Sequence, residues 1–107
     1  MIFAEFYGPS SLYADALSAL EQSVAGVLHA RPEDVVIRRI ETESDYPGAE
    51  VWVELSSDEQ VVRHGQELAR AITGVLRALA EGEVWVLFRI VPLQHVFLNG
   101  EPRARGS

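Results

Sequence analysis

The sequence predicts a two-layer α+β fold, a four-stranded sheet with two helices on one face, from three observations. Residues 50–100 read in order as a strand, a capped amphipathic helix, a second strand and a short closing segment. Residues 2–42 repeat the strand, helix, strand order. The triplet Gly-Val-Leu recurs at 26–28 and 74–76, at corresponding places in the two predicted helices. The chain is therefore predicted to be two tandem β-α-β units.

The length of 107 residues is that of one domain with one core. We place the two units at about 1–45 and 46–100, with residues 101–107 as a tail. The connection at 43–48 is polar and rich in turn residues, but it is too short to separate two domains.

The first unit begins with a short apolar and aromatic strand at residues 2–7. A helix is predicted from about Ser11, because apolar residues then recur at spacings of four and three. The residues expected to pack on the sheet are Leu12, Ala16, Leu20, Val24, Val27 and Leu28. We interpret His29 as a cap in the last turn, where a partial positive charge suits the helix dipole, and Pro32 as a stop.

Residues 35–43 are predicted as the second strand, with neither face uniformly apolar. Arg38 and Arg39 are adjacent, so one of them must point towards the helix-covered side or lie near an edge. The acidic residues around the end of this strand are interpreted as a solubilising loop: Glu41, Glu43 and Asp45.

The second unit carries the clearest signals. In the strand at 50–55, apolar residues alternate with charged residues and Trp52. Ser57 and Gln60 form a capping box at the start of the helix predicted over 57–79. Its buried stripe is Val61, Leu68, Ile72, Val75, Leu76 and Leu79. Gly65 lies on the stripe, where the missing side chain allows a close approach to the sheet.

The last strand, residues 84–91, is nearly continuously apolar and ends before Pro92. This pattern predicts a strand buried on both faces in the middle of a sheet. If the helices cover one face, the other must also be covered, so we expect this face to pack against copies of the same chain.

Composition excludes several function classes. The net charge is −7 and the nine basic residues, all Arg, are spread along the chain, which argues against nucleic acid as a partner. The absence of Lys excludes lysine Schiff-base and phosphate-loop chemistry. There is no cysteine, signal peptide or apolar run long enough to span a membrane, so a cytoplasmic location is expected. The sequence has no metal-ligand spacing and no cofactor motif, and we expect neither group.

Three segments resemble the tautomerase superfamily: residues 54–60, 84–91 and 94–100. Small members, such as 4-oxalocrotonate tautomerase, have one such unit, and longer ones, such as macrophage migration inhibitory factor, fuse two. The resemblance implies a homotrimer of fused units whose sheets form an inner barrel. It also implies isomerase-like activity on small keto or enol acids, with a small carboxylate as ligand.

Family activity depends on an N-terminal proline whose secondary amine acts as a general base. This sequence departs from that pattern, because Ile2 is too bulky for the usual removal of Met1 and Pro47 is internal. The substrate-binding arginines are also replaced, by Ser56 and Trp85. The sequence therefore predicts a superfamily member without the catalytic proline.

Five residues are candidates for a divergent site. The α-amine of Met1, with an ordinary pKa of about 7.7 to 8.0, can serve as a base or an imine-forming nucleophile, or simply begin a strand. Arg38 and Arg39 can bind a carboxylate, or form intersubunit ion pairs. His95 lies in the segment that reaches a neighbour's pocket in this family, and it can equally be an interface residue. Trp85, like Trp52, is an interface anchor or a pocket wall.

Two functions remain open at this stage. One is a divergent small-molecule site at the subunit interface, and the other is a non-catalytic trimer that binds a ligand or has a structural role. A third interpretation, an unrelated ferredoxin-like domain, has the same element order and a different strand order. The closing segment at 95–100 favours the tautomerase topology.

Overall fold

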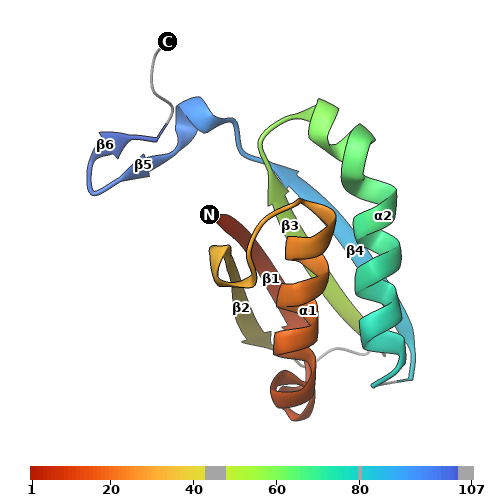
Figure 1. Ribbon diagram of the computed structural model, residues 1–107. Helices are drawn as coiled ribbons and strands as arrows, with labels where there is room; N and C mark the ends of the chain where they lie inside the picture. Colours follow the sequence, from red (N-terminus) through yellow and green to blue (C-terminus); the bar gives the residue numbers. More distant parts are fainter. Residues whose placement is uncertain (43–47, 80, 104–107) are drawn as a thin grey trace.

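The computed structural model describes residues 1–42, 48–79 and 81–103. Two β-α-β units follow one another, and a small C-terminal hairpin comes last (Figure 1). The main elements are β1 (Ile2–Gly8), α1 (Tyr13–Val27), β2 (Val35–Glu41), β3 (Gly48–Leu55), α2 (Asp58–Arg77) and β4 (Glu83–Ile90). The hairpin pairs β5 (Phe97–Leu98) with β6 (Glu101–Pro102). Single 3-10 turns lie at Ser10–Leu12, Pro32–Asp34 and Leu93–His95.

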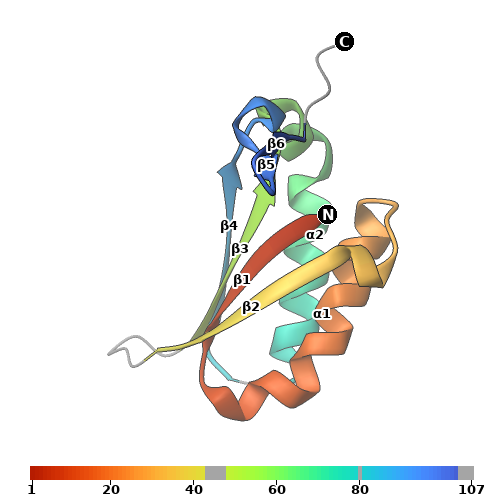
Figure 2. The same ribbon diagram turned by 90° about the vertical axis from the view of Figure 1, so that its left-hand side faces the viewer.

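The four long strands form one sheet in the order β2-β1-β3-β4. Strands of the same unit are parallel, whereas β1 and β3, which join the units, are antiparallel, with Ala4 opposite Val53. Both helices cover one face of this sheet (Figure 2). The predicted fold class is therefore confirmed, and the ferredoxin-like alternative is wrong, because that fold splits its β-α-β units.

The start of α2 is fixed by a side-chain cap. Ser57 has an extended backbone, and its hydroxyl accepts a hydrogen bond of 3.3 Å from the backbone N–H of Gln60. The side-chain oxygen of Gln60 accepts from the backbone N–H of Ser56, one residue earlier than in a regular capping box. Asp58 and Glu59 add negative charge at the positive end of the helix dipole.

The core lies between the helices and the sheet. The side chains that are almost fully buried include Phe6, Leu20, Val24, Val51, Val53, Leu68, Ile72 and Leu76. At Gly65 an added Cβ would lie 3.3 Å from Cε2 of Phe88 on β4, which explains the absence of a side chain. The predicted helix stripes are confirmed except at Leu79, which follows the end of α2 and is exposed.

Three other expectations differ from the structure. β4 lies at the edge of the sheet, not in its middle, and Trp85 on it is 51% exposed. The helix of the first unit begins at Tyr13, after a 3-10 turn, and ends before His29, which has a left-handed backbone with φ 56°. β2 ends at Glu41, and the predicted loop residues Glu43 and Asp45 lie outside the described residues, as does Pro47.

One face of the sheet carries no helix and is called the open face here (Figure 2). Its side chains alternate with the buried ones along each strand: Phe3, Glu5, Tyr7, Val36, Arg38, Ile40, Glu50, Trp52, Glu54, Trp85, Leu87 and Arg89. The C-terminal hairpin projects beyond the end of the sheet (Figure 1). Within the described part of the chain, neither helix has the length and apolar character needed to cross a membrane.

Candidate functional site

Met1 lies at the end of the sheet where β4 also ends. Ile2 pairs with Val35 on β2, and the antiparallel seam places this end of β1 beside the last residues of β3 and β4. Apolar side chains are exposed here: Met1 74%, Ile90 39%, Leu93 53%, Phe97 61% and Leu98 54%. We call these five residues the apolar end. An exposed cluster of this kind is typical of an interaction surface.

An acidic group lies near the N-terminal amine. Arg31 donates to both oxygens of Asp34, from Nε at 3.2 Å and from Nη2 at 3.3 Å. These hydrogen bonds are the main cause of a lowered pKa at Asp34, and the positive charge of the chain's α-ammonium adds a smaller effect in the same direction. Asp34 is therefore a carboxylate at neutral pH, close enough to Met1 to interact with its charge.

The two candidate arginines do not converge on Met1 within one chain. Arg38 pairs in register with Glu5, three residues beyond Ile2, which is about 10 Å along a strand. Its guanidinium lies over the ring of Phe3, 5.2 Å from the centroid. Arg39 points to the helix side, opposite Phe6, and is exposed because β2 is an edge strand. Neither arginine forms an ion pair with a described carboxylate.

The remaining two candidates are separated by most of the sheet. His95 is exposed at the end of the 3-10 turn Leu93–His95, between β4 and the hairpin, on the side of Met1. Trp85 lies level with Glu50 and Tyr7, five residues beyond Ile2, which is about 17 Å from the apolar end. A pocket holding both Met1 and Trp85 would therefore need two copies of the chain.

Sequence reasoning missed a polar network on the open face. Nη1 of Arg89 donates to Oε1 of Glu5 at 2.5 Å, and its guanidinium lies 4.8 Å from the ring centroid of Trp52. The hydroxyl of Tyr7 donates to the other oxygen of Glu5 at 3.2 Å. Burial raises the pKa of Tyr7, and the hydrogen bond to Glu5 raises it further. Alternation along the last strand is a signal that could have placed Arg89 on this face, but only the strand order shows that Arg89 lies near Glu5.

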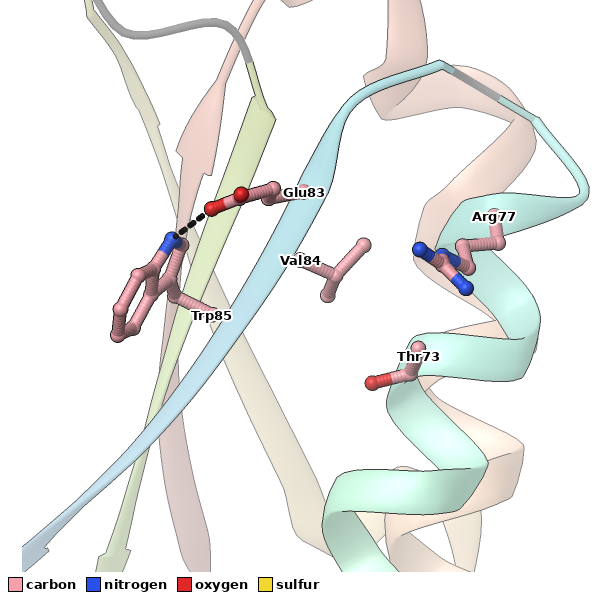
Figure 3. Close-up of a pocket in the computed structure, with 5 residues that line it drawn as sticks. All are labelled: Thr73, Arg77, Glu83, Val84 and Trp85. Carbon is pink, nitrogen blue, oxygen red and sulfur yellow. Dashed lines mark hydrogen bonds between the residues drawn. The ribbon is translucent and has the colours of Figure 1, made fainter.

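A hollow lies near the end of β4 that is far from Met1. Thr73 and Arg77 on α2 face Val84 across a cleft of about 290 Å³, which the neighbouring residues Glu83 and Trp85 also line, although their side chains point to the other side of β4 (Figure 3). We call this hollow the α2–β4 cleft. The indole N–H of Trp85 donates to the carboxylate of Glu83 at 3.2 Å. Among the described residues, no cluster of His, Cys, Asp or Glu could hold a metal ion.

Comparisons with known proteins identify the fold. Neither a protein-family model nor a curated protein matches the sequence. A solved structure of a fused 4-OT asymmetric trimer superposes with a TM-score of 0.75 at 16% identity, covering 94% of both chains. The fold is tautomerase-like. A macrophage migration inhibitory factor-like protein from Entamoeba histolytica superposes with a TM-score of 0.74 at 7% identity, over 94% of this chain and 96% of that one.

A third similar solved structure is that of a protein inactivated by a small reactive keto acid. Pt0534, inactivated by 2-oxo-3-pentynoate, superposes with a TM-score of 0.70 at 15% identity, over 92% of this chain and 93% of that chain. At sequence identities this low, the likeness to these solved structures shows the fold alone.

Proposed function

We propose that this protein is a tautomerase-superfamily homologue without the catalytic proline. It assembles as a homotrimer and holds a small carboxylate or keto acid between subunits near Met1. The observation that carries the proposal is the apolar end, where Met1, the end of β4 and the segment that follows it all expose apolar side chains.

Assembly accounts for two features that a lone chain leaves without a role. A two-stranded hairpin is marginally stable in water by itself, and Phe97 and Leu98 on β5 are mostly exposed. The open face also exposes half of Trp85 at an edge strand. A second and third copy would cover both regions, as the trimeric state of the fused 4-OT neighbour supports.

The proposed site is completed by a neighbour. Arg38 is about 10 Å and Trp85 about 17 Å from the level of Ile2 in the same chain, so the guanidinium and indole that contact the ligand belong to other subunits. The guanidinium of Arg38 or Arg39 binds the ligand's carboxylate, and His95 approaches from the closing segment. The Met1 amine then transfers a proton from carbon to oxygen of the keto acid as a general base.

The first experiment is the mass of the purified protein by light scattering, where a trimer is expected and a monomer contradicts the assembly. The second compares turnover of phenylpyruvate and 2-hydroxymuconate by the native protein and by a form with a blocked N-terminus. We expect activity only with the free amine. Equal rates in both forms, or none in either, would exclude Met1 from catalysis.

A covalent probe tests the same amine directly. The neighbour Pt0534 is inactivated by 2-oxo-3-pentynoate, so we expect this reagent to modify the N-terminal peptide, read by peptide mass spectrometry. Prior blocking of the amine should abolish the adduct. An adduct at His95 alone would move the nucleophile to the closing segment and contradict the role of Met1.

The second candidate is a non-catalytic trimer that binds a ligand or has a structural role. The exposed apolar end favours it, because another copy or a ligand can cover these side chains without any chemistry at Met1. The two functions predict different results, since a trimer with no turnover and no N-terminal adduct supports the second.

A further inference from the structure

The two edge strands of the sheet carry opposite charges on the open face. Strand β2 is one edge, and Arg38 on it is exposed. Strand β4 is the other edge, and the side chains of Glu83 and Trp85 on it point to the open face, away from the α2–β4 cleft (Figure 3). Within the described ranges, the outer side of each edge strand has no paired neighbour. Because β4 is also largely apolar, its edge needs a cover.

The surroundings of Trp85 suit a cation. Its indole is half exposed, and the indole N–H donates to the carboxylate of Glu83, so the face of the ring remains available. Glu50 lies directly opposite Trp85 on β3, and its carboxylate accepts a hydrogen bond of 2.9 Å from the indole of Trp52. A guanidinium over an indole is attracted by the electrons of the ring, and the two carboxylates add Coulomb attraction.

Arg38 on the other edge is a cation that a second copy can use. Among the described residues it forms no ion pair with a carboxylate, and its guanidinium lies over the ring of Phe3. Arg89, the other guanidinium of the open face, is already bound to Glu5. Within one chain Arg38 and Trp85 cannot meet, because β1 and β3 separate their strands by about 14 Å.

The charges favour contact between unlike edges. Pairing two β2 edges about a twofold axis would bring Arg38 and Arg39 of one copy beside the same two residues of the other, and like charges repel. Contact of β2 with β4 instead joins opposite charges. This contact is head-to-tail, so it can repeat from each copy to the next until a ring closes and covers every edge.

We propose that β2 of one copy docks on β4 of the next, with the guanidinium of Arg38 over the indole of Trp85 and beside the carboxylates of Glu83 and Glu50. This inference rests on the homotrimer of the proposed function and names the contact that closes it. Arg38 then holds the copies together, so of the two candidate arginines Arg39 remains to bind the ligand's carboxylate.

The first test measures the mass of the full chain by light scattering across a dilution series. We expect R38Q to raise the protein concentration at half-dissociation at least about tenfold, because all three contacts of a trimer lose their cation. R39Q is the matched control, since it removes the same charge from the helix side of the same strand, and its midpoint should equal the native one. An effect of R39Q as large as that of R38Q would reduce the result to net charge and overturn the proposal.

An exchange of charges tests which edges meet. R38E puts a carboxylate against Glu83 and Glu50, and E83R puts a guanidinium against Arg38, so each variant should be monomeric where the native protein is trimeric. The double variant R38E/E83R restores opposite charges at every contact of β2 with β4, and the trimer should return. If the double variant stays monomeric while circular dichroism shows a native fold, the edges do not meet in this way and the proposal is wrong.

The contact between the guanidinium and the ring is tested with W85L. This variant should also raise the midpoint of dissociation, and R38Q/W85L should add little to either single effect, because both remove the same contact. Fully additive effects would place Arg38 elsewhere on the next copy and overturn the proposal.

The outcomes separate this inference from the function on which it rests. A native protein that is monomeric at every concentration contradicts the homotrimer and the edge contact together. An R38Q protein that remains trimeric with the native midpoint overturns the edge contact alone and leaves the proposed function standing.

Discussion

Arg89 on β4 reaches across β3 to Glu5 on β1, with 2.5 Å between Nη1 and Oε1. The side chain of Glu5 is 17% exposed and that of Arg89 is 43% exposed, so the pair is partly shielded from water on the open face. Trp52 lies between the two strands, with the guanidinium over its ring. The contact ties an edge strand to the central seam of the sheet.

R89M and E5Q should each lower the urea midpoint of unfolding, with a larger loss for R89M. That substitution leaves a mostly buried carboxylate without its cation and also removes the cation over Trp52. A double-mutant cycle should give a stabilising coupling between the two residues.

The exposed pair Arg63–Glu59 on α2 is the control, with 2.6 Å between its charged atoms and side chains 64% and 75% exposed. Its coupling should be smaller, because solvent screens exposed pairs. Equal coupling energies in the two double-mutant cycles would mean that the partly shielded position of the Glu5–Arg89 pair adds no stability over an exposed pair.

F97D should convert the proposed trimer into monomers without unfolding them. Phe97 lies on the projecting hairpin, 61% exposed, and contributes nothing to the buried core, so a charge there would act on the proposed interface alone. Light scattering gives the mass, and circular dichroism checks the fold. V62D is the matched control, because Val62 on α2 is 86% exposed and its substitution should leave the mass unchanged. A trimeric F97D protein would rule out the hairpin as an assembly element.

G74A should stabilise the protein by about 0.5–1 kcal/mol, because alanine favours a helix more than glycine. The position is exposed and an added Cβ meets nothing within 4 Å. G65A makes the same chemical change on the buried side of the same helix, where the methyl group would press on Phe88. We expect it to destabilise by about 1 kcal/mol, since overpacking offsets the helix gain. Equal free energies of unfolding for the two variants would show that Phe88 moves aside without cost.

D34N should remove part of the acid sensitivity of the fold. The pKa of Asp34 is lowered in the folded state, chiefly by the hydrogen bonds from Arg31, so the folded chain releases this proton more readily than the unfolded chain. Its stabilising contribution is therefore complete above the unfolded value of about 3.9, and disappears as the pH falls through the lower folded value. Urea midpoints measured against pH should fall less steeply in D34N in this acid range. An identical slope in both proteins would mean that the ion pair does not form in solution.

Local sequence signals predicted most of the fold. Spacings of four and three identified the buried faces of both helices, and alternation in residues 50–55 placed Trp52 on the face away from them. The Ser57 cap was predicted because the side chain and its N–H partner are only three residues apart. Such interactions depend on neighbours in the chain, so the sequence is sufficient to find them.

Two features could not be predicted without the strand order: the edge position of β4 and the contact between Glu5 and Arg89. A continuous apolar run fits a strand buried by its own chain and equally one that a partner covers. β4 has such a run, but it lies at the edge of the sheet and half of Trp85 is exposed. Glu5 and Arg89 are 84 residues apart in sequence. For the same reason the position of Trp85, remote from Met1, was not predictable from residue types.

The antiparallel seam between β1 and β3 joins the two halves of the chain. Each β-α-β unit contributes one strand to this antiparallel seam, and each keeps its parallel partner strand within its own sequence. The two halves therefore bind each other through the β1–β3 seam and through the contact between α1 and α2. The covalent link between them raises their effective concentration. The protein is in effect a heterodimer of two related fragments, and residues 1–42 and 48–107 supplied as separate polypeptides retain the surfaces needed to find each other.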